Sequence, residues 1–170
     1  MDRKTDPFRA SSFHESNTAA VHVGRVLEIR VARGYRAVAD IDAMCSAIAR
    51  EMRKVSDPRG VVTIADWRRC SIISPVPAER LLQLLTDGNP RNDRSAALAT
   101  TDSPSAVMQF VRLIRESGHA TRRLFYDARE LHAWVGEVLT HAEQARVAQF
   151  LEEDSAQDCP LGFRVLSRAP

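Results

Sequence analysis

Short apolar runs alternate along this chain with longer segments whose apolar residues recur at helical spacing, and this alternation constrains the fold most strongly. The short runs are rich in β-branched and aliphatic residues, as in strands buried within a sheet. Each longer segment has an apolar stripe that another element must cover. Alternating strands and helices are typical of right-handed crossovers and a largely parallel sheet. We therefore predict an α/β fold: a small, mostly parallel sheet of four to five strands with alternating helices and an appended C-terminal helix.

The predicted strands differ in the chemistry of their two faces. In residues 21–32 the polar side chains of His22, Glu28 and Arg30 alternate with apolar ones, which gives this strand one polar face. Such a strand belongs at or near an edge of the sheet, and Gly24 is placed to bend it. We expect the further, more apolar strands at residues 61–67, 95–100 and 123–127.

Capping residues set the boundaries of the predicted helices. Ser74 is expected to cap a helix that has Pro75 in its first turn and ends at Gly88. Thr140 and Glu143 have the spacing of a capping box, which predicts a last helix packed on the domain. The other helices are expected over about residues 37–55, 104–118 and 127–139. In the helix after Pro104, the expected buried stripe is Val107, Phe110, Val111 and Ile114.

Length and composition place the chain among single-domain globular proteins. A chain of 170 residues, 44% hydrophobic and 27% charged, has room for one core. We assign residues 19–154 to the domain, residues 1–18 to an N-terminal extension and residues 155–170 to a C-terminal tail. The first residues lack the apolar core of a signal peptide, and no run reaches the roughly 18 apolar residues of a membrane span. We therefore expect a cytoplasmic protein without membrane insertion.

Charge and cysteine usage argue against several kinds of ligand. The net charge of +2 lacks the basic bias of proteins that bind nucleic acid through its phosphates. Cys45, Cys70 and Cys159 are odd in number and form no CxxC pair, which predicts reduced thiols and no zinc site. The histidines lack metal-ligand spacing, and the sequence has neither a GxGxxG nor a Walker loop. We therefore predict no metal, no cofactor and no nucleic-acid partner.

Three stretches within roughly residues 21–139 carry a family resemblance: VGRVLEIRVARGYRAVADIDAM, VVTIADWRR and NPRNDRSAALATTDSPSAVMQFVRLIRESGHATRRLFYDARELHAWV. In element order and apolar pattern they resemble the STAS and SpoIIAA-like proteins. The resemblance implies a small sheet backed by helices that makes regulatory protein contacts, and that in some relatives binds lipid or small ligands. Anti-sigma-factor antagonists of this group carry a phosphoacceptor serine in an Asp-Ser-Ser-Gly turn. The matching turn reads ADWRRCSIISP and lacks that sequence, which argues against a phosphorylation switch.

A candidate binding rim follows the second and third predicted strands. In open α/β sheets, functional groups gather beyond the carboxyl ends of the strands. The rim for a partner or ligand consists of Asp66, Trp67, Arg68, Arg69, Cys70, Ser71, Ser74, Thr101, Asp102 and Ser103. In the alternative interpretation, Ser74, Ser103 and Asp127 serve only as helix caps.

Cys70 is the candidate for a nucleophile. It follows two arginines and precedes a predicted helix, and both features would lower the pKa of its thiol. The following residues, SIISPVP, lack the anion-binding loop of a rhodanese or phosphatase, so the alternative is an unreactive, half-buried cysteine.

A cluster of arginines is expected at the amino edge of the sheet. The residues before or at the start of the third and fourth predicted strands include Arg91, Arg94, Arg122 and Arg123. They form either a shallow patch for an anionic partner, or solvated side chains paired with carboxylates such as Asp93 and Glu116.

The absence of an assembled catalytic set from the sequence favours binding over catalysis. We expect a non-enzymatic regulatory module that docks another protein, with a homodimer as one form. The alternative is a protein that binds a lipid or another small apolar ligand between a helix and the sheet. The third interpretation is a thiol-dependent enzyme that uses Cys70.

Overall fold

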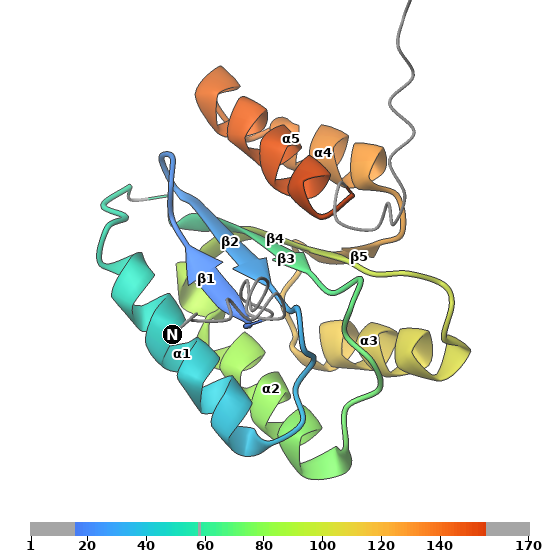
Figure 1. Cartoon of the computed structure of the whole chain (residues 1–170). Coiled ribbons are helices and arrows are strands. Elements are labelled where there is room, and N and C mark those ends of the chain that lie inside the picture. Colours follow the sequence, from blue (N-terminus) through green and yellow to red (C-terminus); the bar gives the residue numbers. More distant parts are fainter. Residues whose placement is uncertain (1–15, 58, 156–170) are drawn as a thin grey trace, which may run out of the picture.

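The computed structural model describes residues 16–57 and 59–155, in which helices cover both faces of one sheet (Figure 1). Within these residues the sheet has five strands, which lie side by side in chain order: β1 (Thr18–Ala20), β2 (Val26–Arg30), β3 (Val61–Asp66), β4 (Asn92–Leu98) and β5 (Arg122–Phe125). The helices are α1 (Val38–Met52), α2 (Pro75–Asp87), the 3-10 turn η1 (Asn89–Arg91), α3 (Pro104–Glu116), α4 (Ala128–Gly136) and α5 (His141–Ser155). β1 is antiparallel to β2, and the other neighbours are parallel. The predicted fold class is confirmed.

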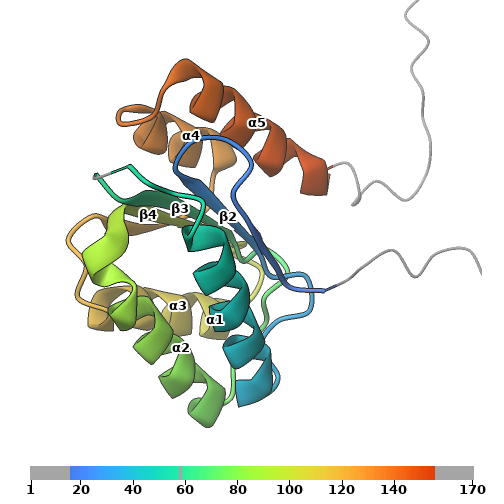
Figure 2. The same ribbon diagram turned by 90° about the vertical axis from the view of Figure 1, so that its left-hand side faces the viewer.

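The order of the strands sorts the helices into two layers. Because β2 to β5 are parallel neighbours in chain order, right-handed crossovers bring α1, α2 and α3 to the same face of the sheet. Helices α4 and α5 follow the last strand and cover the opposite face (Figure 2). The apolar core under α4 and α5 includes Val62, Ile64, Leu98, Leu131 and Phe150. The sheet thus separates two cores.

The predicted first strand is wrong in its extent, because the chain reverses within it. Residues 21–25 form a loop and turn, and Gly24 has a φ of 57°. Glycine adopts this left-handed conformation readily because it has no Cβ. The residues before the turn form β1, so Thr18 lies in the edge strand and not in an N-terminal extension. The rest of that extension, up to residue 15, and the tail from residue 156 lie outside the described residues.

Helix α5 covers the polar face of β2. Glu28 is 3% exposed and accepts a hydrogen bond from Nε of Arg146 at 2.7 Å. Arg30 donates to the carbonyl of Phe150 at 2.8 Å and lies over its ring. The predicted inner residues of this helix, Val147, Phe150 and Leu151, are buried. Buried ion pairs and apolar contacts therefore hold α5 on the sheet, as expected of an appended helix.

The capping residues predicted from the sequence lie at helix ends. Ser74 is the N-cap of α2, Pro75 is in its first turn and Gly88 is its C-cap. The capping box before α5 is also formed. The Thr140 N–H donates to Oε2 of Glu143 at 2.9 Å, and the Glu143 N–H donates to Oγ1 of Thr140 at 3.4 Å.

The predicted buried stripe of α3 is partly wrong. Its buried residues are Ala106, Phe110 and Leu113, whereas Val111 is 43% exposed. Phe110 packs on Trp67, with ring centroids 5.1 Å apart. The buried side of α3 is therefore rotated from the predicted one, with Phe110 common to both.

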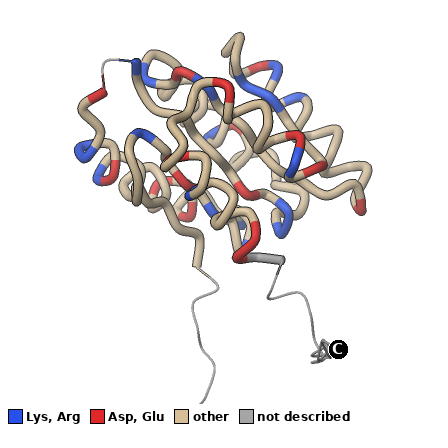
Figure 3. Tube along the Cα trace, turned by 90° about the horizontal axis from the view of Figure 1, so that it is seen from above, with Lys and Arg blue, Asp and Glu red and all other residues tan. Residues whose placement is uncertain are grey.

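The distribution of charge is mixed over the described part of the chain. Figure 3 shows basic and acidic residues interspersed along the trace, without separation onto two sides. Among the described helices, none is long and apolar enough to cross a membrane.

Candidate functional site

A cavity of about 280 Å³ lies between the sheet and helices α1 and α2. Strands β2, β3 and β4 provide one side of it, and the two helices provide the other. Its lining is mainly apolar and includes Ile29, Met44, Ile48, Trp67, Leu81 and Leu84. Leu84 and Leu85 of α2 are partly buried and border this space.

The cavity exists because the central strands have small side chains on this face. Alternate residues of a strand point to opposite faces of the sheet. The residues of β3 and β4 that line the cavity include Thr63, Ala65, Ser95 and Ala97. Those that pack in the opposite core include the larger Val62, Ile64 and Leu98. The same two strands therefore build a filled core on one side and leave space on the other.

One end of the cavity is polar. The strand register places Thr63 of β3, Ser95 of β4 and Arg122 of β5 in one row across the sheet, and all three line the cavity. Oγ1 of Thr63 donates a hydrogen bond to Oδ1 of Asn92 at 2.6 Å, and Asn92 is also part of the lining. The cavity therefore joins an apolar body to a polar end.

Arg122 brings a buried positive charge to this polar end. It is 6% exposed. Its guanidinium donates to Oγ of Ser95 at 3.3 Å, to Oγ of Ser117 at 2.6 Å and to the carbonyl of Leu85 at 3.1 Å. Burial lowers the pKa of Arg122 to about 10, so the group stays charged at neutral pH. In residues 16–57 and 59–155 no carboxylate forms an ion pair with it.

The first residues of the candidate rim turn inward. Asp66 is 2% exposed, and its Oδ2 lies 2.7 Å from Nη2 of Arg68. Arg68 also donates to the carbonyl of Leu151, so this pair fastens α5 to the sheet. Trp67 is 3% exposed, packs on Phe110 and lines the cavity. Of the ten predicted rim residues, Trp67 is the member that belongs to the cavity.

Apart from Cys70, the other rim residues lie at or near the surface, and some cap helices. Ser103 accepts a hydrogen bond from the Ala106 N–H at 3.4 Å, and Asp127 accepts two from the first turn of α4. Ser74 is an N-cap by position but makes no side-chain capping bond. The exposed members are Ser71, Ser74, Thr101, Asp102 and Ser103, and Arg69 is partly buried. Partner docking at these residues stays a prediction.

The surroundings of Cys70 oppose a reactive thiolate. Cys70 is 6% exposed. Burial raises the pKa of its thiol to about 12, and a hydrogen bond from the Tyr35 backbone offsets this only in part. The shift is opposite to the one expected from the neighbouring arginines, because the thiol lies within the core and not at an open helix end.

The predicted arginine cluster divides between the two faces of the sheet. Arg94 and Arg123 both lie over the ring of Trp134, at 4.4 and 4.9 Å from its centroid. Arg94 is also paired with Glu137 at 2.8 Å. Arg122 is buried on the opposite face, at the cavity, and Arg91 is an exposed residue of the cavity lining. The four arginines therefore do not form a single surface patch.

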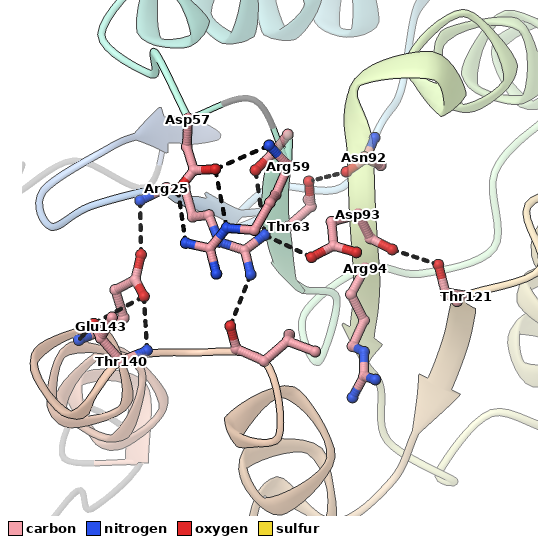
Figure 4. Close-up of polar contacts among 12 residues, drawn as sticks. Arg25, Asp57, Arg59, Thr63, Asn92, Asp93, Arg94, Thr121, Thr140 and Glu143 are labelled. Carbon is pink, nitrogen blue, oxygen red and sulfur yellow. Dashed lines mark hydrogen bonds and ion pairs between the residues drawn. The ribbon is translucent and has the colours of Figure 1, made fainter.

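A second buried arginine, Arg25, connects distant segments at the amino ends of the strands (Figure 4). Its guanidinium donates to Oδ2 of Asp93 at 2.7 Å, to the carbonyl of Val138 at 2.7 Å and to the carbonyl of Gly60 at 3.3 Å. Its backbone N–H donates to Oε1 of Glu143 at 2.9 Å. Because Arg25 is 1% exposed and already paired with Asp93, we assign this network to the stability of the fold.

The sequence contains a signal for the cavity, but the pattern of a single strand does not reveal it. Small residues occupy alternate positions of two neighbouring strands, as Thr63 and Ala65 in one and Ser95 and Ala97 in the next. Arg122 opens the following strand in the same row. Reading these strands in register, rather than one at a time, indicates an underfilled face with a cation at one end.

The described segments contain no group of three or more His, Cys, Asp or Glu residues that could hold a metal ion. Comparisons with protein-family models, with curated proteins and with solved structures gave no match.

Proposed function

We propose that this protein binds a small, largely apolar molecule in the cavity between α1, α2 and the sheet. The observation that carries the proposal is the cavity itself, about 280 Å³ in volume with an apolar body and polar groups at one end. Protein interiors are close-packed, with few voids larger than a water molecule. Ligand pockets, in contrast, combine apolar walls with a few placed polar groups. The lining of this cavity has that combination of apolar walls and a few polar groups.

The volume sets the size of the ligand. An apolar cavity of about 150 Å³ takes up benzene. A cavity of 280 Å³ is about twice as large and therefore accommodates about ten to twelve non-hydrogen atoms. This volume is close to the lower limit of about 300 Å³ for ordinary ligand pockets. A chain of about eight carbons with a small polar head fits this size.

A titration with 1-octanol tests the proposal, with Trp67 as the reporter. Trp67 lines the cavity, whereas Trp134 stacks with arginines on the opposite face. In a Trp134→Phe variant, tryptophan fluorescence therefore reports on the cavity. We expect a saturable change with a dissociation constant below about 1 mM, since about 0.5 kcal/mol for each of about ten atoms gives about 5 kcal/mol.

Cavity-filling variants supply the control. Ala97→Leu places a larger side chain in the cavity, and Ala65→Leu does so from the neighbouring strand. Ala43→Leu makes the same change at an exposed position of α1. Both filled variants should bind 1-octanol at least tenfold more weakly than wild type, and Ala43→Leu should bind it equally well. Circular dichroism checks that each variant is folded. Saturable binding that persists in folded Ala97→Leu and Ala65→Leu would refute the proposal, as would its absence from the wild type.

The expected regulatory docking module remains a second proposal. Ile72, Val76 and Met108 are 59%, 64% and 71% exposed. Hydrogen bonds between the backbone of Ile73 and the side chain of Gln109 join the loop before α2 to α3, so these apolar side chains lie on neighbouring segments. Exposed apolar groups near the predicted rim support protein contacts there. The docking surface and the cavity involve different side chains, so the two proposals are compatible.

A further inference from the structure

We propose that the ligand of this cavity is a monocarboxylic acid with an apolar tail, and that Arg122 binds its carboxylate. The inference rests on the proposed function and specifies the chemical class of the ligand. The position, the pairing and the free donors of Arg122 support it. Arg25 differs from Arg122 in its pairing, and Arg123 differs in its position.

The two buried arginines of the described chain differ in their pairing. Arg25 is 1% exposed and has the carboxylate of Asp93 at 2.7 Å. Arg122 is 6% exposed, and its hydrogen-bond partners among the described residues are two hydroxyl groups and one carbonyl, all uncharged. A buried cation without an opposite charge costs free energy. An anion that enters the cavity would supply the missing charge.

The guanidinium of Arg122 is held in place and keeps donors for a ligand. Arginine has five N–H donors. The bonds to Ser95, Ser117 and Leu85 use one donor on each nitrogen, which leaves one N–H on each terminal nitrogen without a partner among the described residues. Two such N–H groups can bind the two oxygens of a carboxylate. Because existing bonds already fix the side chain, little ordering is needed when the ligand binds.

The other charges of the cavity lining favour a singly charged anion. Besides Arg122, the charged lining residues are Asp87 and Arg91, both exposed. Asp87 accepts a hydrogen bond from Gln83 at 2.6 Å and so has a polar partner of its own. The lining therefore carries one more positive than negative charge. One carboxylate balances this excess, whereas a doubly charged phosphate would not be matched.

A purely structural role for Arg122 predicts a different result. The guanidinium bonds to the last turn of α2, through Leu85, and to the C-cap of α3, Ser117. Helix C-terminal ends stabilise a cation by themselves. If this is the whole function of Arg122, the cavity will not distinguish a carboxylate from a neutral head group.

A ranking of eight-carbon probes on the full-length wild type decides between the two roles. Isothermal titration at pH 7 is carried out with octanoate, 1-octanol, octylammonium, octyl phosphate and acetate. We expect octanoate to bind at least tenfold more tightly than 1-octanol, and octylammonium and acetate to bind more weakly than both. Equal or tighter binding of 1-octanol overturns the carboxylate assignment but leaves the proposed function intact. Tighter binding of octyl phosphate also overturns it. Failure of every eight-carbon probe to bind overturns both proposals.

Arg122→Gln and Arg123→Gln form a matched pair of variants. The two residues are neighbours in β5, but Arg123 lies over Trp134 on the opposite face of the sheet. Arg122→Gln should lose the preference for octanoate over 1-octanol, and Arg123→Gln should retain it. An unchanged preference in folded Arg122→Gln contradicts the assignment. If Arg122→Gln does not fold, the wild-type ranking decides the question alone.

Discussion

Replacement of Gly24 by alanine tests how the β1–β2 turn is joined to α5. Gly24 has a φ of 57°, a conformation that costs other residues about 1–2 kcal/mol. An added Cβ would also lie 2.2 Å from Oε1 of Glu143, the first buried side chain of α5. Glu143 therefore has to move, and it is the acceptor for the Arg25 and Thr140 N–H groups.

The cost of Gly24→Ala can be worked out from these contacts. Hydrogen bonds to a charged group contribute about 1.5–3 kcal/mol each. Loss of one or two of them as Glu143 moves adds about 1.5–6 kcal/mol to the backbone strain. Gly118→Ala gives the matched control, because Gly118 has a φ of 69° and no heavy atom lies within 4 Å of its added Cβ. That variant should lose only the strain of about 1–2 kcal/mol.

Urea unfolding followed by circular dichroism measures both variants. The free energy of unfolding should fall by about 1.5–6 kcal/mol more in Gly24→Ala than in Gly118→Ala. A double-mutant cycle locates the cause: in a Glu143→Ala background the clash is absent, so Gly24→Ala should cost no more than Gly118→Ala. Equal losses in the wild-type background, or a cost of Gly24→Ala that does not change when Glu143 is removed, would show that the reasoning is wrong.

Two further predictions concern titratable groups. Burial alone would raise the pKa of Glu143, but hydrogen bonds from Arg25 and Thr140 outweigh it and hold the pKa below its usual range. The stability that Glu143 contributes is therefore present above its unfolded pKa of about 4.3 and lost as the pH falls through the lower folded value. Urea unfolding between pH 7 and pH 3 should show a shallower acid loss for Glu143→Gln than for wild type; equal slopes would contradict this. A pKa of about 12 leaves about one Cys70 thiol in 10⁴ ionised at pH 8, so iodoacetamide followed by peptide mass mapping should label the partly buried Cys45 before Cys70. Labelling of Cys70 at the same rate would disprove its protection.

Much of the fold could be predicted because its signals are local. Helix α2 begins and ends at the predicted capping residues, and the capping box before α5 lies where Thr140 and Glu143 predicted it. The hairpin of β1 and β2 was missed because its apolar alternation continues through the turn at Gly24. The exposure of Val111 was missed because helical spacing alone does not fix which side of α3 packs on the sheet. The resemblance to STAS and SpoIIAA-like proteins stays a prediction.

The candidate site was harder to predict because it depends on several elements at once. Single strands show Thr63, Ala65, Ser95 and Ala97 as ordinary small residues, and only the register between strands makes them one surface. Arg122 was expected with other arginines at the amino edge, but alternation within β5 sends it and Arg123 to opposite faces. The pattern of one strand therefore predicts which of its residues are buried, whereas predicting the cavity also requires the register with the neighbouring strands.

The division of the molecule by its sheet makes the two halves separately adjustable. Large side chains and ion pairs hold α4 and α5 on one face of the sheet, and none of these residues takes part in the cavity lining. Residues of α1 and α2 that border the cavity, such as Ile48 and Leu84, can thus be varied without altering the core under α4 and α5. An engineer who wanted sensors for different small acids could redesign the residues that line the cavity and keep the core under α4 and α5 unchanged to preserve stability.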